Sequence, residues 1–117
     1  MTNAEVVVVL VTAPSEDEAR RIGQTLVGER LAACVNVVGP IRSIYRWEGA
    51  VQEEAEHLLI AKARREDVDT LAARVRALHP YEVPEVIALD VTAGSAPYLD
   101  WVQRATDRPG KGGRHEP

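Results

Sequence analysis

Hydrophobic and polar positions along the chain switch between two periods, and the switches divide it into strands and helices. Residues 5–13 are nearly all apolar and β-branched, which predicts a strand buried on both faces. Apolar residues then recur at helical spacing over 16–32, and Ser15 stands three residues before Glu18 in the pattern of a capping box. The chain therefore begins with a buried strand followed by an amphipathic helix.

A pair of unusually long strands comes next. The stretch 31–47 is rich in β-type residues and 50–63 is again extended, so Glu48–Gly49 is expected to form a two-residue hairpin turn. Gly39–Pro40 interrupts the first of these strands, and because proline lacks a backbone donor the pair predicts a bulge or an edge position. The expected cross-strand pairs are Tyr45 with Gln52 and Ser43 with Glu54.

Three further elements complete the pattern. Apolar residues at helical spacing predict a helix over 65–78, which His79-Pro80 ends. Residues 85–92 read as a strand, and 95–106 as a short helix with Ser95 as its cap and a proline in its first turn.

The element order β-α-β-β-α-β-α defines the expected fold. Its first six elements form the split βαβ arrangement, an α+β ferredoxin-like sandwich with an antiparallel sheet and both helices on one face. We expect one domain over residues 1–106. The remaining residues, 107–117, have no apolar pattern and are expected to be a disordered tail, so that His115 is only solvated.

The predicted hairpin is too long for a domain of this size. Two strands of about 14 residues, at about 3.3 Å per residue, would reach roughly 45 Å. A compact domain of about 100 residues has a diameter of only about 35 Å. Apolar residues near the tip of the hairpin would be exposed to solvent in a single chain, so we expect the hairpin to pair with strands of further copies of the protein. The alternative is a hairpin that bends back over its own sheet at Gly39–Pro40.

Composition and charge narrow the class of protein. The 117 residues are 45% hydrophobic and 27% charged, which is typical of a soluble globular protein. Phenylalanine is absent, so the core is expected to be built from Val, Leu, Ile and Ala with the two Trp and three Tyr. The net charge of -4 argues against a nucleic-acid partner. An RNA-recognition module, which has the same strand order, would also need aromatic stacking residues on its middle strands.

The single cysteine and the N-terminal sequence also exclude certain classes. One cysteine forms neither an internal disulfide nor a structural zinc site, so Cys34 is interpreted as a small buried apolar residue at a strand start. The apolar run Val6–Val11 is too short to span a membrane and has no basic region before it. We therefore expect a cytoplasmic protein without a membrane partner.

Several motifs together resemble the CutA family of divalent-cation tolerance proteins. They are "VTAPSEDEARRIGQTLVGERLAACVNVV", "SIYRWEG", "EEAEHLLIAKA", "HPYEVPEVIAL" and "YLDWV", in the order of the family and across residues 6–103. The resemblance implies a cytoplasmic homotrimer of ferredoxin-like subunits, similar in architecture to the PII signalling proteins. It also implies an association with tolerance of copper and other divalent ions, and no secure catalytic activity.

The resemblance also suggests where a metal ion would bind. Members proposed to bind copper can have a cysteine just before "TAP" and a His-His pair before "PY"; this chain has Val11 and Leu78-His79 there. His79 is thus the candidate ligand for Cu(II) or another divalent cation, although a lone imidazole needs further donors. The alternative role for His79 is a helix cap, favoured by the helix dipole. No cofactor is required.

Other residues are candidates for a cleft and an interface between subunits. Strand alternation places Glu54, Glu56 and Lys62 on one face, where acids of one hairpin can meet a Lys or His of a neighbour. Such a meeting would form an ion-pair network or a metal-accessible carboxylate cluster. Lys62 could bind an anion or extend into solvent. The predicted cleft residues are Glu56, Lys62 and Tyr81, and the predicted trimer-interface residues are Tyr45, Trp47 and Trp101.

Three functions compete at this point. The first is a trimeric, non-enzymatic protein of metal-ion homeostasis that binds divalent cations. The second is a PII-like sensor that binds a small anionic metabolite between subunits through Lys62, although no Gly-rich phosphate loop supports it. The third is a small hydrolase of the acylphosphatase shape, but the acidic "TAPSED" stands where a phosphate-binding loop would need arginine.

Overall fold

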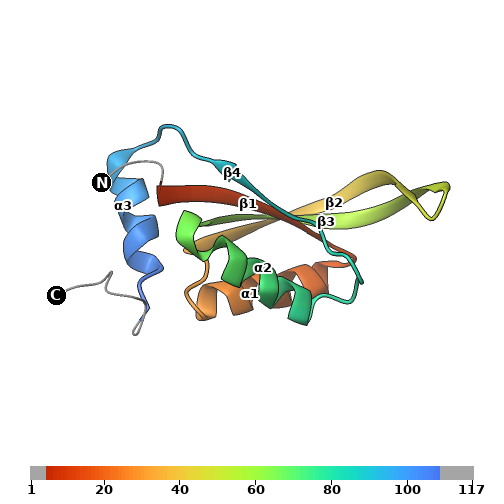
Figure 1. The fold of residues 1–117 in the computed structure, drawn as a ribbon, viewed down its shortest axis with the longest axis horizontal. Helices are drawn as coiled ribbons and strands as arrows, with labels where there is room; N and C mark the ends of the chain where they lie inside the picture. Colours follow the sequence, from red (N-terminus) through yellow and green to blue (C-terminus); the bar gives the residue numbers. More distant parts are fainter. Residues whose placement is uncertain (1–4, 109–117) are drawn as a thin grey trace.

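Four strands form one antiparallel sheet with two helices packed on one face in the computed structural model, which describes residues 5–108 (Figure 1). The elements in chain order are β1 (Val6–Ala13), α1 (Glu16–Gly28), β2 (Cys34–Trp47), β3 (Ala50–Arg64), a 3₁₀ helix (Arg65–Asp67), α2 (Val68–Leu78), β4 (Val86–Asp90) and α3 (Ala96–Ala105). The strand order β2-β3-β1-β4 is that of a ferredoxin-like fold, so the predicted fold class is confirmed.

The main core lies between the sheet and the helices α1 and α2. It is built from valine, leucine, isoleucine and alanine, as expected, but the tryptophans and tyrosines that were also expected in it are not among its members. Its fully buried members come from β1, α1, β3 and α2: Val7, Val9, Val11, Ala13, Ala19, Ile22, Leu26, Leu59, Ala61, Ala63, Leu71 and Val75.

Helix α1 begins as predicted but ends earlier. The backbone N–H of Glu18 donates to the Ser15 hydroxyl at 3.1 Å, which is one half of the capping box. The predicted end at residue 32 is wrong, because the helix stops at Gly28. The Leu31 N–H returns to the Leu26 carbonyl at 2.9 Å, and Leu31 becomes buried. The apolar residues after Gly28 therefore continue the core without continuing the helix.

The hairpin of β2 and β3 has the predicted turn and register. Glu48 and Gly49 both have positive φ, at 50° and 82°, as a type I′ turn requires. The expected pairs of Tyr45 with Gln52 and Ser43 with Glu54 are both present.

The hairpin extends beyond its own domain as a long arm (Figure 1). The chain measures 52 × 28 × 24 Å and has a radius of gyration of 15.1 Å, larger than the roughly 13 Å of a compact domain of about 100 residues. The alternative in which the hairpin bends back over the sheet is therefore wrong.

A β-bulge interrupts β2 at Gly39–Pro40, as predicted. Val38 pairs with Leu58 and Ile41 pairs with Glu56. The two residues between them in β2 therefore stand opposite a single residue of β3, His57. Partners in a register share a face of the sheet. Before the bulge, even-numbered residues of β2 lie on the same face as even-numbered residues of β3; after the bulge, odd-numbered residues of β2 do so.

Gly39→Ala is expected to lower the free energy of unfolding by about 1–3 kcal/mol, as overpacking does. A Cβ at Gly39 would lie 2.4 Å from Cδ2 and 2.7 Å from Cγ of His57, so the ring or the bulge must move. Urea unfolding followed by circular dichroism measures the loss. Gly28→Ala is the control, because a Cβ there meets nothing within 4 Å.

The same clash predicts a rescue. In a His57→Ala background the ring is absent, so Gly39→Ala should cost much less than in the parent chain. An equal cost in both backgrounds would show that the clash with His57 is not its cause.

Helix α3 packs against the end of the sheet where β1 begins and β3 ends. Leu99 and Val102 of α3 bury Val6 and Ala33 in a second, smaller apolar cluster. Ser95 is the N-cap and Pro97 lies in the first turn, as expected. No helix within residues 5–108 is both long and apolar enough to cross a bilayer.

Two residues of the predicted tail are held by the folded chain. Asp107 accepts from the buried Arg64 at 2.8 Å, and Arg108 lies 3.4 Å from the buried Asp67 carboxylate. These contacts involve the first two residues of the predicted tail, and the disorder of that tail stays a prediction. The rest of that prediction, 109–117 with His115, lies outside the described residues.

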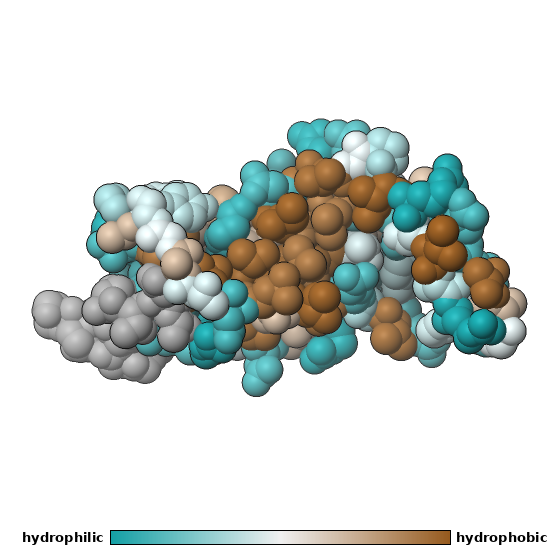
Figure 2. Space-filling model, turned by 90° about the horizontal axis from the view of Figure 1, so that it is seen from above, coloured by the Kyte–Doolittle hydropathy of each residue, from teal (hydrophilic) through white to brown (hydrophobic). Residues whose placement is uncertain are grey.

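The face of the sheet opposite α1 and α2 is apolar over its middle. We call this surface the open sheet face, and Figure 2 shows it as a broad hydrophobic area over the sheet. Its outer members are the most exposed, with Ile87 and Leu89 each 50% accessible. The register places the following side chains on it: Val8, Leu10, Val38, Leu58, Ile60, Ile87 and Leu89.

Candidate functional site

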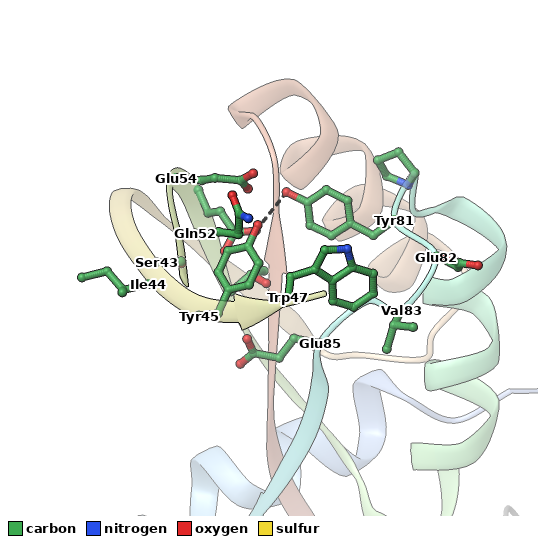
Figure 3. Close-up of a pocket in the computed structure, with 13 residues that line it drawn as sticks. Ser43, Ile44, Tyr45, Trp47, Gln52, Glu54, Tyr81, Glu82, Val83 and Glu85 are labelled. Carbon is green, nitrogen blue, oxygen red and sulfur yellow. Dashed lines mark hydrogen bonds between the residues drawn. The ribbon is translucent and has the colours of Figure 1, made fainter. Parts of the chain in front are cut away.

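A pocket of about 800 Å³ lies where the hairpin arm leaves the domain. Its walls come from the distal halves of β2 and β3 and from the loop between α2 and β4 (Figure 3). This volume is within the range of small-molecule sites in proteins. We call it the arm pocket.

Three aromatic side chains line the arm pocket. Tyr45 and Trp47 come from β2, past the bulge, and Tyr81 comes from the loop that follows α2. Figure 3 shows the three rings gathered around one opening. Tyr45 and Trp47 remain 38% and 44% exposed in the single chain, so their rings can contact a bound molecule or a neighbouring subunit.

Glu56 is the buried polar group of the pocket. Only 6% of it is exposed, and its Oε2 accepts a hydrogen bond from the Tyr81 hydroxyl at 3.0 Å.

Burial of the Tyr81 phenol, together with this hydrogen bond and the nearby negative charge, raises the pKa of Tyr81. The phenol therefore stays protonated and donates at physiological pH. The structure thus brings the predicted cleft residues Glu56 and Tyr81 into contact.

The lining of the arm pocket is acidic. Glu54, Glu56, Glu82 and Glu85 contribute to it, and no lysine or arginine does among residues 5–108. Partial desolvation, followed by the neighbouring Glu54 and Glu56, raises the pKa of Tyr45. The pocket therefore favours a positively charged occupant.

Lys62 lies away from this pocket. Its ammonium group hydrogen-bonds to the Asn36 side chain, near the beginning of β2. It shares a face of β3 with Glu56, as alternation predicted, but stands six residues further along the strand. The chain therefore does not unite Lys62 with Glu56 and Tyr81 in one cleft.

His79 is buried at the end of α2, with both ring nitrogens engaged. Nε2 lies 2.7 Å from the Thr12 carbonyl and so donates, and Nδ1 accepts from the Tyr81 N–H at 3.1 Å. Its own backbone N–H bonds to the Val75 carbonyl as the C-cap of α2. His79 thus fastens the α2–β4 loop to β1, which positions Tyr81.

These bonds bear on the expected copper site. A metal at His79 would have to replace one of the two ring hydrogen bonds, because a ligating nitrogen needs a free lone pair. Within residues 5–108, no three His, Cys, Asp or Glu side chains of one chain come together as a metal site. Val11, at the position of the family's cysteine, is fully buried in the core. A single chain therefore does not fit a copper ion there, and the ligand role of His79 stays a prediction.

Trp101 and Cys34 lie at the α3 end, opposite the tip of the arm (Figure 1). Trp101 packs against Tyr98 with ring centroids 5.6 Å apart and is 38% exposed. Cys34 begins β2 as predicted, but it is only half-buried, and its Sγ lies 3.5 Å from the Tyr98 hydroxyl. The interface role of Tyr45, Trp47 and Trp101 stays a prediction.

Sequence reasoning missed Glu82 and Glu85 as pocket residues. Both belong to the "YEVPE" segment, which loops past the arm before β4. No local pattern in the sequence indicates which strands such a loop faces. A third contributor, Thr12, is the β1 residue to which His79 bonds.

The fold and the pocket define a class of protein: a ferredoxin-like α+β domain with an extended hairpin arm and a pocket at its base. The family model described as "CutA1 divalent ion tolerance protein" matches residues 7–105. The chain therefore belongs to the CutA1 divalent ion tolerance family. This family is described by tolerance of ions and not by a reaction.

Individual relatives agree with this assignment. The divalent-cation tolerance protein CutA of Thermus thermophilus is 52% identical over 99 residues, which are 85% of this chain and 96% of that protein. A solved structure from the same organism has a TM-score of 0.85 at 51% identity, covering 87% of this chain and 99% of the other. Protein CutA 1, chloroplastic, of rice is 46% identical over 90% of this chain, and the match spans 59% of the rice protein.

Proposed function

We propose that the protein is a homotrimeric, cytoplasmic, non-enzymatic protein of divalent-cation tolerance, which binds divalent cations at the boundaries between its subunits. Membership of the family carries the proposal, since the Thermus thermophilus relative bears that name at 52% identity. The number of three subunits follows from the family resemblance.

The open sheet face supports the assembly. A contiguous apolar surface that spans all four strands of a sheet is rare on a monomer and marks an interaction surface. The arm adds a second reason, because a two-stranded ribbon is marginally stable unless it packs on something else. Copies that cover the open sheet face and support the arm would satisfy both.

The arm pocket supports cation binding better than anion binding. Carboxylate oxygens suit hard divalent cations. Glu54 is exposed at the pocket and, in an assembly, could join donors of a neighbouring chain. An anionic metabolite would meet four glutamates in this pocket and would have to bind elsewhere, beside Lys62. The PII-like alternative is therefore the weaker candidate.

Native mass spectrometry of the protein titrated with Cu(II) tests this proposal. We expect a trimer that gains copper, with binding weakened several-fold by Glu54→Gln. Glu53→Gln is the matched control: it removes the same charge one residue away, where Glu53 lies 3.5 Å from Arg42 and outside the pocket. A trimer without copper would favour the sensor alternative, and a monomer would refute the proposed assembly.

A further inference from the structure

A buried carboxylate without a cationic partner is the starting point. Glu56 is more than nine-tenths buried. Within residues 5–108, its carboxylate accepts a hydrogen bond from the neutral Tyr81 hydroxyl and forms no ion pair. Buried charges in proteins are normally paired or bound to an ion, because an isolated one is costly to desolvate. The position next to Glu56 therefore suits a positive group, and Glu56 lines the arm pocket.

The walls of the pocket indicate what kind of cation would fit. The faces of Tyr45, Trp47 and Tyr81 can attract a cation that has lost part of its hydration shell. Organic ammonium ions are weakly hydrated and bind in aromatic surroundings, whereas a divalent metal ion needs several converging oxygen or nitrogen ligands. Within the described chain, no group of three such ligands converges.

The size of the pocket agrees with this distinction. About 800 Å³ is far more than a metal ion occupies and is enough for a small organic molecule. The hairpin contributes Trp47 and Glu56 to the walls, and the α2–β4 loop contributes Tyr81 and Glu85. Each of these two parts of the pocket therefore carries both an aromatic ring and a carboxylate.

We propose that the arm pocket binds a small organic cation with an alkylammonium head, which packs against Tyr45, Trp47 and Tyr81 and pairs with Glu56. All of these residues belong to one chain and lie on the same side of the sheet as the open sheet face, so the proposal requires that the pocket stays open between the subunits of the proposed trimer. It names a second class of ligand for the protein, recognised by charge together with aromatic faces.

Choline and its uncharged carbon isostere dimethylbutanol are the probes that test this proposal. The two have the same shape and differ in charge, so isothermal titration calorimetry on the assembled protein measures what the charge contributes. We expect choline to bind with a dissociation constant near or below about 1 mM and dimethylbutanol to bind at least about tenfold more weakly. Equal binding of the two, or no choline binding up to about 10 mM, would overturn the proposal.

Matched variants locate the site. Glu56→Gln keeps the shape of the side chain and should weaken choline binding about tenfold or more, and Trp47→Leu about fivefold. Glu53→Gln removes the same charge one residue before Glu54, outside the pocket, and should leave the affinity unchanged. If Glu53→Gln weakened choline as much as Glu56→Gln, general attraction to an acidic protein would explain the binding and the proposal would fail.

The Cu(II) titration remains separate from this test. Trp47→Leu should leave copper uptake intact, because an indole is not a ligand for a divalent metal, while it weakens choline. Failure of choline binding with copper uptake preserved would overturn the organic-cation proposal alone, and the reverse would overturn the divalent-cation proposal alone.

Discussion

Replacing Arg64 with alanine is expected to lower the free energy of unfolding by about 3 kcal/mol, because buried acceptors lose their donor. Only 5% of Arg64 is exposed. Its guanidinium donates to the Thr106 hydroxyl and the Asp107 carboxylate, both at 2.8 Å, and to the Gln103 carbonyl. These three acceptors belong to the last turn of α3 and the two residues beyond it, so the substitution should release the C-terminal helix first.

The neighbouring arginine provides the control. Arg65 pairs with Asp90 at 2.7 Å, but its side chain is 48% exposed and that of Asp90 is 63% exposed. Exposed ion pairs contribute about 1 kcal/mol at most, so Arg65→Ala should have a much smaller effect. Urea unfolding at a fixed protein concentration compares the two, and hydrogen exchange should show faster exchange in α3 for Arg64→Ala only. Equal losses would mean that net charge, not the buried contacts, determines the effect.

Replacing Leu89 with glutamate is expected to dissociate the proposed trimer. Leu89 lies on the open sheet face and is half exposed in the single chain, so the fold itself should tolerate the change. In an assembly that covers this face, each copy would bury an unpaired carboxylate, at several kcal/mol each. Sedimentation equilibrium should therefore show the dissociation constant raised by about a thousandfold or more.

Val27→Glu is the matched control for assembly. Val27 is 40% exposed and lies on α1, in the helical layer on the other side of the sheet. The same substitution there should leave the oligomeric state unchanged. A Leu89→Glu variant that sediments like the parent protein would show that the open sheet face is not the surface through which copies associate.

Local patterns in the sequence predicted the fold well for a physical reason. A two-residue turn with Gly49 fixes the register of the hairpin next to it, and the Gly39–Pro40 pair marks the bulge, because both effects depend on residues adjacent in the chain. The end of α1 was missed because Leu31 and Ala32 continue the apolar spacing of a helix and are in fact buried beyond its end.

The candidate site was harder to predict because it depends on distance as well as on the face of a strand. Alternation correctly placed Glu56 and Lys62 on one face, yet six residues of strand separate them by about 20 Å. Glu85 comes to the pocket through the path of a loop, which no periodicity encodes. Arg64 was missed for another reason: a charged residue at a strand end is normally expected at the surface, and only the packing of α3 buries it.

Because of the bulge at Gly39–Pro40, the number of residues in β2 determines which side chains of the arm face the pocket. Before it, the even-numbered Asn36 and Val38 share a side of the sheet with Leu58 and Ile60; after it, the odd-numbered residues of β2 do so. Because of this change, Tyr45 and Trp47 lie on the same side of the hairpin as Glu54 and Glu56.

Substitutions along the arm can thus alter the pocket gradually over evolution. The loss of a single residue at the bulge would instead turn the aromatic walls to the other side at once. We therefore expect the number of residues between the start of β2 and its turn to be under stronger selection than most of their identities.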